Sequence, residues 1–278
     1  MAEASAIEWT EATWNPWMGC TRVSPGCAHC YMFTEQTRYG QNPEVVRRSK
    51  TKFADPLKWK EPRTIFTCSW SDWFHPDADQ WRAEAWDVIR QTPQHTYQIL
   101  TKRPERMATH LPPDWGLAGY PNVWLGVSIE AQRYDFRAAM LCQFPAHVRF
   151  ISAEPLLGPL HLTRVNPFAE SHDRQFAIRD QNFIGVDVLE WPSHPPLWYR
   201  EGRRMGRIDW VIAGGESGPN ARACNMDWAR ILRDDCARAG VGFFLKQLGG
   251  FPDKRGGEQA VLDGRRHTEM PPVGLRLA

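Results

Sequence analysis

The chain contains six runs of mostly apolar residues, each of which ends in small polar or charged side chains. The runs cover residues 63–68, 96–100, 123–127, 148–151, 208–213 and 241–245. Short segments that are apolar almost throughout are typical of strands buried on both faces of a parallel sheet. The pattern therefore predicts a mostly parallel sheet whose outer side is covered by helices.

Amphipathic segments lie between these runs, and two of them, residues 76–91 and 225–239, have the spacing of a helical face. The first face consists of Trp81, Ala85, Val88 and Ile89, and the second of Trp228, Ile231, Leu232 and Cys236. Asn225 or Asp227 is the expected N-cap of the second helix, and Gly240 lies just beyond its end. Alternating strands and helices predict an α/β fold, namely a partial (β/α) barrel of six or seven mostly parallel strands.

The length of 278 residues fits one such barrel, so we expect a single domain over residues 1–278. Residues 163–207 interrupt the alternation of strands and helices with mixed charge and several prolines. We interpret them as an insertion or lid over the barrel rim. From residue 251 onward we expect an irregular tail. The sequence shows neither a membrane-length apolar run nor a secretory signal, so we expect a cytoplasmic protein that does not bind membranes.

In a barrel of this kind, the polar residues at the strand ends meet on one rim, where active sites are built. Here they are Ser69, Ser71, Asp72, Lys102, Ser128, Glu130, Glu154, Glu216 and Lys246. Any single one of them could equally cap a helix. Because six successive strand ends share this character, a common pocket is favoured.

Three of the seven cysteines, Cys20, Cys27 and Cys30, lie within eleven residues, and Pro25 and Gly26 give their loop its turns. Three thiolates on one short loop are typical of a [4Fe–4S] cluster with one iron left open for a small molecule, whereas four cysteines make a closed electron carrier. The use that we expect for such a site is reductive cleavage of S-adenosylmethionine.

Two other uses of the cysteine loop are alternatives to the cluster. A disulfide framework is disfavoured, because the number of cysteines is odd and the chain has no secretory signal. A zinc site that adds His29 or His75 stays open as an alternative, although only Cys27 and Cys30 form the paired knuckle that zinc modules usually repeat.

The remaining cysteines are scattered along the chain. Cys142 and Cys236 fall in helical patterns, where we expect small core side chains. Cys68 and Cys224 follow predicted strands and are therefore weaker site candidates.

The net charge of +2 excludes a strong basic field over the whole molecule. Basic residues do gather in 47–52 and 200–207; such runs are usually solvated surface, but they permit contact with nucleic acid. Most of the fourteen tryptophans are expected in the core, and a few could stack on bases.

In combination, several motifs resemble a phage-associated family of radical S-adenosylmethionine proteins. They occupy residues 14–20, 20–31, 71–72, 100–104, 126–130, 152–155 and 214–218. The resemblance covers roughly residues 7–249 without the insertion. Six residues separate Cys20 from Cys27, whereas most radical S-adenosylmethionine enzymes have three in this gap.

The resemblance implies a [4Fe–4S] cluster and S-adenosylmethionine as cofactors. Cys20, Cys27 and Cys30 would hold three irons, and the fourth would take the methionine amino and carboxylate groups. The end of the second strand of the barrel, with Ser69, Ser71 and Asp72, would steady the amino group.

Further roles at the rim follow from the same resemblance. Ser128 and Glu130 would hold the ribose, and Lys102 the methionine carboxylate. Glu154 or Glu216 would face adenosine or substrate.

For the reaction, the resemblance implies an isomerase of phage thymidine hypermodification. The substrate would be a thymine in DNA whose 5-methylene carries glycine through nitrogen. A hydrogen would be removed from the glycine α-carbon, and the methylene would migrate from nitrogen to carbon. The modified base would protect the viral genome from host restriction. An external electron donor and a place in the host cytoplasm are implied too, and the base would have to leave the duplex stack.

Two other functions stay open. One is a DNA-lesion lyase resembling spore photoproduct lyase, in which Cys224 would donate hydrogen. The other is a metal-cluster protein that binds nucleic acid without catalysis. For a catalytic role, the candidates are Glu216, Lys246 and Cys224.

Overall fold

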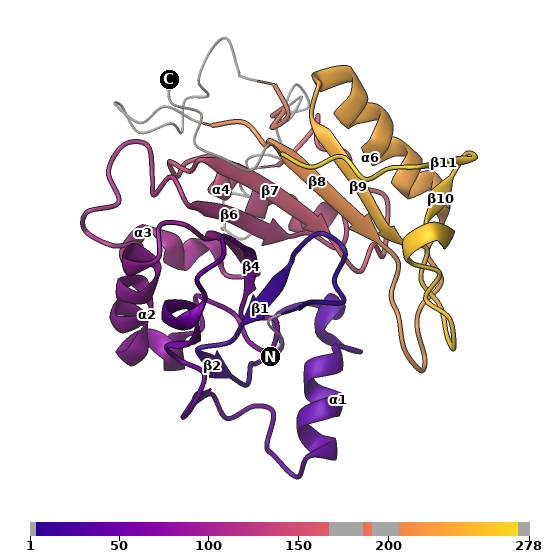
Figure 1. Ribbon diagram of the computed structural model, residues 1–278. Coiled ribbons are helices and arrows are strands. Elements are labelled where there is room, and N and C mark those ends of the chain that lie inside the picture. Colours follow the sequence, from indigo (N-terminus) through magenta and orange to yellow (C-terminus); the bar gives the residue numbers. More distant parts are fainter. Residues whose placement is uncertain (1–3, 167–185, 191–205, 272–278) are drawn as a thin grey trace.

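The computed structural model describes residues 4–166, 186–190 and 206–271, and its centre is a seven-stranded sheet (Figure 1). In spatial order the strands are β1 (Ala12–Trp14), β4 (Thr64–Thr67), β5 (Thr96–Thr101), β6 (Val123–Ser128), β7 (Val148–Ala153), β8 (Trp210–Gly214) and β9 (Gly242–Gln247). Every neighbouring pair is parallel, and spatial order follows chain order. The sheet forms a half-barrel, so the predicted partial (β/α) barrel is confirmed.

All six predicted apolar runs form strands of this sheet. Four of the strands extend into the polar residues that follow the apolar run, ending at Thr101, Ser128, Ala153 and Gln247. The seventh strand, β1, was not predicted, because three residues are too few to show a period. Its pairing with β4 matches Ala12 with Ile65 and brings the cysteine loop to the edge of the barrel.

Five helices are described: α1 (Tyr31–Arg38), α2 (Asp79–Gln91), α3 (Met107–His110), α4 (Phe136–Leu141) and α6 (Met226–Ala239). As predicted, Asn225 is the N-cap of α6, and its side chain accepts from the Asp227 backbone N–H at 2.9 Å. Gly240 ends the helix with a left-handed φ of 64°.

Three residues of the predicted face of α2, Ala85, Val88 and Ile89, are buried as expected, and the fourth differs. Trp81 is only half-buried, whereas Arg82 is 3% exposed. The guanidinium of Arg82 donates to the carbonyl oxygens of Trp73 at 3.0 Å and His75 at 2.7 Å, and it also contacts Asp79. A buried arginine is accommodated because its donors are used by backbone acceptors that no hydropathy pattern reveals.

Two apolar cores lie on the two faces of the sheet. The outer core includes side chains of the helices α2, α4 and α6, and the buried tryptophans Trp14, Trp73 and Trp86 belong to it. The inner core is aromatic and consists of Trp9, Phe66, Trp124, Val148, Phe150, Trp210, Ile212 and Phe244. Tryptophans therefore serve mainly in packing, as expected.

The remaining strands are short. β2 (Trp17–Met18) pairs antiparallel with β3 (Arg47–Arg48) beside the cysteine loop. The tail expected to be irregular from residue 251 contains an antiparallel hairpin of β10 (Val261–Leu262) and β11 (Arg265–Arg266). It then runs along the free edge of β9, where the Leu245 N–H donates to the His267 carbonyl at 2.8 Å.

Most of the predicted insertion or lid at 163–207 falls on residues 167–185 and 191–205, which lie outside the described residues. Two of its described parts, residues 163–166 and 186–190, are joined by an antiparallel bridge between Val165 and Val186. None of the helices in the described ranges has both the length and the apolar character needed to cross a membrane.

Candidate functional site

Cys20, Cys27 and Cys30 line one cavity of about 150 Å³ at the carboxyl ends of β4, β5 and β6. The loop that carries them includes a 3-10 turn at Pro25–Cys27, and Cys30 immediately precedes α1. The predicted rim residues that share this cavity are Ser69, Ser71, Asp72, Lys102 and Ser128. The fold therefore brings the cysteines and three strand ends together.

Glycine is needed where the loop enters the cavity. Gly19 has a φ of 100°, and a Cβ there would overlap the carbonyl oxygen of Val45. Its own carbonyl accepts from the Ser71 hydroxyl at 2.5 Å, and its N–H donates to the Trp70 carbonyl at 3.0 Å. The backbone beside Cys20 is thus fixed to the residues that follow β4.

Burial controls the chemistry of the thiols. It raises the pKa of Cys20 to about 12, with a further contribution from the nearby carboxylate of Asp72. Burial also raises the pKa of Cys30. Without a metal, Cys20 and Cys30 are protonated at neutral pH, so their binding to a metal centre would release protons.

Asp72, expected near the methionine amino group, lines the cavity, but its carboxylate is already held by the chain. It accepts from the Thr101 hydroxyl at 2.6 Å and from the backbone N–H groups of Phe74 and Lys102, each at 2.9 Å. Asp72 thereby joins the segment after β4 to the end of β5.

Glu130, expected near the ribose, is not among the residues that line the cysteine cavity. It is 1% exposed and accepts from the Ser24 hydroxyl at 2.5 Å and from Arg137 at 3.0 Å, with the Lys102 ammonium at 3.5 Å. Burial alone would raise the pKa of Glu130, but Lys102 and Arg137 bring it below its ordinary value. Gly26 packs directly on this side chain, since a Cβ on Gly26 would come within 2.5 Å of it. Glu130 therefore supports the cysteine loop through its contacts with Ser24 and Gly26.

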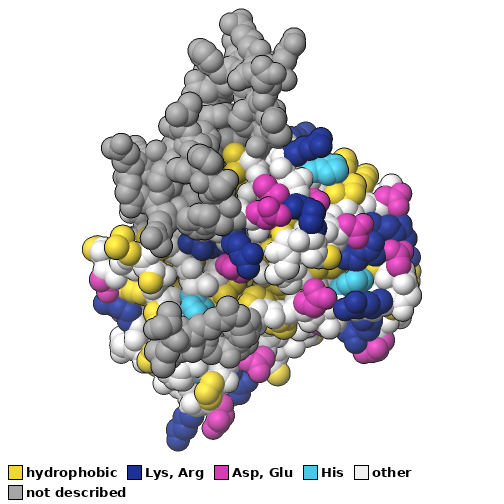
Figure 2. All heavy atoms as spheres, turned by 90° about the horizontal axis from the view of Figure 1, so that it is seen from above, with side chains coloured by type: hydrophobic (Ala, Val, Ile, Leu, Met, Phe, Trp, Pro, Cys, Tyr) yellow, Lys and Arg dark blue, Asp and Glu magenta, His cyan; other side chains and the backbone are white. Residues whose placement is uncertain are grey.

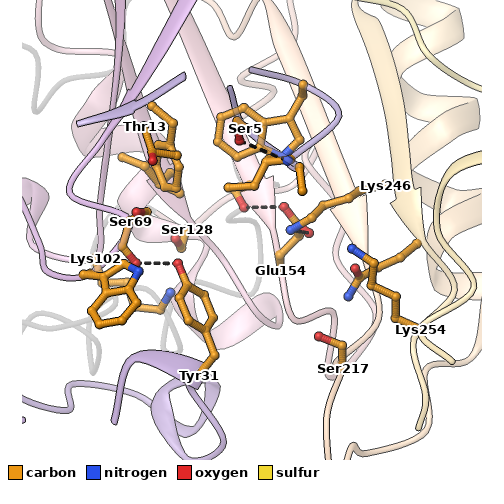
Figure 3. A pocket seen from close by; sticks show the side chains of 18 residues that line it. Ser5, Thr13, Tyr31, Ser69, Lys102, Ser128, Glu154, Ser217, Lys246 and Lys254 are labelled. Carbon is orange, nitrogen blue, oxygen red and sulfur yellow. Dashed lines mark hydrogen bonds and ion pairs between the residues drawn. The ribbon is translucent and has the colours of Figure 1, made fainter. Parts of the chain in front are cut away.

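A second cavity of about 460 Å³ adjoins the first (Figure 3). Both cavities are lined by Phe66, Ser69, Leu100, Lys102 and Ser128. The size falls within the roughly 300–1,000 Å³ of small-molecule sites.

The walls of the second cavity combine aromatic rings and charges. Tyr31 is 52% exposed and donates its hydroxyl to the Ser69 carbonyl, and Trp70 lies on the same wall. Across the cavity, the Lys246 ammonium lies 2.9 Å from Glu154 Oε1 (Figure 3). The predicted Glu154 and Lys246 are thus brought together at this cavity.

Glu216 lies at the edge of the site and joins β8 to the cysteine loop. It accepts from the Arg222 side chain through both oxygens, at 2.5 and 2.9 Å, and lies 2.9 Å from His29 Nδ1. Arg222 also donates to the Pro25 carbonyl at 3.0 Å. Although burial opposes it, hydrogen bonding from Arg222 and His29 lowers the pKa of Glu216 to about 2.

We expect Glu216→Gln to destabilise the metal-free protein by about 1.5–3 kcal/mol, the range for hydrogen bonds to charged groups. Because the folded-state pKa is depressed, this stabilisation is present above the ordinary glutamate pKa and lost as pH falls toward about 2. Urea unfolding over a pH series should show the difference from wild type constant near neutrality and shrinking below about pH 4.5. Glu258→Gln is the matched control, since Glu258 is 87% exposed in its pair with Arg266. A pH-independent difference would contradict this assignment.

A family model covers all the site residues described so far. The chain belongs to the DUF5131 family. The family model, described as "Protein of unknown function", matches residues 4–271 and so spans both cavities. No curated protein and no solved structure matches the chain.

The other cysteines of this DUF5131 protein lie in three environments. Cys142 and Cys236 are fully buried in the outer core, as predicted. Cys68 lines the cysteine cavity and is 3% exposed. Cys224 lines neither of the two cavities, and burial raises the pKa of its thiol to about 11.

The histidines weighed for a zinc site have other partners. His29 contacts Glu216, and His75 Nδ1 accepts from the Asp77 N–H at 3.2 Å while its Nε2 lies 3.0 Å from the Thr21 hydroxyl. Across the described ranges, no group of three or more His, Cys, Asp or Glu side chains is arranged to hold one metal ion.

In the first basic run the two arginines contact other parts of the protein, whereas Lys50 and Lys52 are exposed. Arg47 donates to Gln36 at 2.5 Å, and Arg48 pairs with Glu84 and covers the ring of Phe53. Most of the second run lies outside the described residues. On the face shown in Figure 2, basic and acidic side chains are interspersed. Among the ion pairs of the described residues, Arg230 and Asp263 lie 2.8 Å apart.

Residues that the sequence analysis did not assign also line the site. They are Thr21, Tyr31, Trp70, Arg103 and Lys254. Arg103 lies in the motif at residues 100–104, and Tyr31 directly follows Cys30. Their positions next to assigned residues are the signal in the sequence that could have identified them.

Proposed function

We propose that this protein is a radical S-adenosylmethionine enzyme. The observation that carries the proposal is the junction of two cavities: three cysteines line one, and five of its residues also line a neighbouring cavity of small-molecule size. Cys20, Cys27 and Cys30 would hold a [4Fe–4S] cluster, and S-adenosylmethionine would extend from it into the larger cavity.

The residues present fit the cluster. Soft thiolate ligands favour iron–sulfur centres, and three of them on one loop leave an iron open. Ligands of a cluster bind separate irons, so they need not meet the geometry of a single metal ion. Bound there, the cluster would supply the electron for reductive cleavage of S-adenosylmethionine.

The chain's own side chains would orient the second cofactor. Lys102 lines both cavities and offers a cation to the methionine carboxylate, while Ser69 and Ser128 offer hydroxyl groups at the junction. Trp9 and Phe66 of the aromatic inner core line the larger cavity, and this core would keep water from the reacting atoms.

For the substrate, we propose a thymine in DNA that carries glycine through nitrogen on its 5-methylene. The protein would isomerise it to the carbon-linked form, a change that leaves the composition of the base unaltered. Tyr31 and Trp70 offer rings on which an extruded base could stack, and Lys254 is an exposed cation at the same cavity. An external electron donor would reduce the cluster.

We expect anaerobically reconstituted, reduced protein to convert S-adenosylmethionine to 5′-deoxyadenosine and methionine. Lys102→Met should weaken S-adenosylmethionine binding about 10- to 150-fold, because a lost charged hydrogen bond costs roughly 1.5–3 kcal/mol. Lys58→Met is the control, since Lys58 is 68% exposed and pairs with Asp55. Product analysis by mass spectrometry and equilibrium dialysis provide the measurements. Iron-loaded, reduced protein that yields no 5′-deoxyadenosine would disprove the enzyme class.

The substrate is tested with DNA that carries deuterium on the glycine α-carbon. Deuterium should appear in 5′-deoxyadenosine, and Cys224→Ala should retain this transfer because Cys224 lines neither cavity. Repair of ultraviolet-damaged DNA without label transfer would favour the lesion lyase instead. Iron-loaded protein that binds DNA but cleaves no S-adenosylmethionine would favour a binding protein without catalysis.

A further inference from the structure

Arg103 is a buried cation in the wall of the cysteine cavity. It follows β5 and is 6% exposed. Its Nη2 donates to the hydroxyl of Thr21 at 2.6 Å and to the carbonyl of Thr21 at 3.2 Å. Thr21 is the residue next to Cys20, so Arg103 contacts the loop at its first cysteine.

The other terminal nitrogen, Nη1, is buried and has no hydrogen-bond partner among the residues that the structure describes. A buried guanidinium N–H without an acceptor is costly, so a cavity built with one indicates an anionic or polar ligand. Asp72, the carboxylate in the same wall, is already taken by Phe74, Thr101 and Lys102. Because Arg103 lines this cavity, a ligand bound there is the remaining source of an acceptor.

Cys20 and Arg103 line the same cavity. A cluster held by Cys20 would therefore lie beside the guanidinium of Arg103.

We propose that Arg103 Nη1 donates a hydrogen bond to anionic sulfur of the cluster held by this loop and thereby raises the cluster's reduction potential. The inference rests on the proposed function. In the one-electron reduction, the external reductant is oxidised and the cluster gains one negative charge. A buried cation with a hydrogen bond to sulfur stabilises that added charge, and such hydrogen bonds and net charge are among the factors that set cluster potentials.

The test is a redox titration followed by electron paramagnetic resonance, on reconstituted protein without S-adenosylmethionine. Arg103→Gln should make reduction at least tenfold less favourable, which is 59 mV for one electron. Arg103→Lys keeps the charge but loses the planar pair of donors, so a smaller shift is expected.

Arg22→Gln is the matched control. It removes the same charge, here from the cysteine loop itself, but Arg22 is 47% exposed and pairs with Glu44 at 3.1 Å. Solvent should screen that charge, so the potential should stay within the error of the wild-type value.

The same samples distinguish the sources of the anion. If Arg103→Gln leaves the potential unchanged but weakens S-adenosylmethionine binding tenfold in dialysis, the acceptor is the cofactor carboxylate and the proposal is overturned. If neither changes, Arg103 only positions Thr21, and the proposal is again overturned. If Arg103→Gln fails to assemble a cluster, the potential of Arg103→Lys at wild-type iron content is compared instead. A lowered potential supports the proposal, and an unchanged potential overturns it. A wild-type protein that binds no iron would instead defeat the proposed function itself.

Discussion

Replacing Cys20, Cys27 or Cys30 by alanine is expected to abolish assembly of the iron–sulfur cluster. Each thiolate would hold a different iron, so the two that remain cannot retain a cubane centre. Anaerobically reconstituted wild-type protein should be brown and contain about four irons and four sulfides per chain. Each single variant should lose nearly all of both, measured by chemical analysis of iron and sulfide. Stoichiometric zinc without iron in the wild-type protein would contradict the cluster.

Two further cysteine variants make this test specific. Cys142→Ala removes a fully buried thiol in the outer core and should keep the wild-type iron content. Cys68→Ala is more informative, because Cys68 lines the same cavity as the three loop cysteines. Retained iron would support a three-thiolate cluster with an open iron. Loss of iron would indicate a closed four-thiolate centre and would count against binding of S-adenosylmethionine there.

The fold could be predicted from the sequence because its strands are buried on both faces. Six strands were visible as continuous apolar runs, and their parallel pairing followed from the helices between them. β1 was invisible, since its three residues acquire strand geometry only from the neighbouring β4. The face of α2 was predicted except for the burial of Arg82, which depends on carbonyl groups outside the helix.

The candidate site could be predicted only where its residues lie close together along the chain. The three cysteines share one loop, so their proximity is set by short-range geometry. A carboxylate at a strand end can face either the cavity or the loop, and the sequence does not distinguish the two. Glu130 contacts Ser24 across 106 positions, and Glu216 contacts His29 across 187. Such contacts depend on the curvature of the half-barrel.

Three strand ends hold the cysteine loop. Glu130 after β6 accepts from Ser24, Arg222 after β8 donates to Pro25, and Arg103 after β5 donates to Thr21. Rim residues expected to bind ligand thus also hold the loop in place. A variant at such a residue can lose activity by releasing the loop, so stability and iron content must be measured beside turnover.

Glu130→Ala is expected to destabilise the metal-free protein by about 3–5 kcal/mol, because it leaves a buried cation without its partner. Arg137 is 2% exposed, and Ser24 and Lys102 would lose their contacts with the same carboxylate. Urea unfolding at neutral pH gives the measurement. Glu44→Ala is the control and should cost no more than about 1 kcal/mol, since Glu44 is 58% exposed.

Gly26 makes the role of Glu130 testable a second way. A Cβ on Gly26 would lie 2.5 Å from Glu130 Cγ and Oε1, so Gly26→Ala should destabilise the loop by forcing the buried carboxylate away from Ser24. In the Glu130→Ala background the obstruction is gone, and the added methyl group should cost much less. The double-mutant cycle should therefore show a coupling of roughly 0.5–3 kcal/mol, the range for residues in contact. Additive effects would mean that the loop does not rest on Glu130, and its support would then have to come from its other contacts, those with Arg222, Arg103 and Ser71.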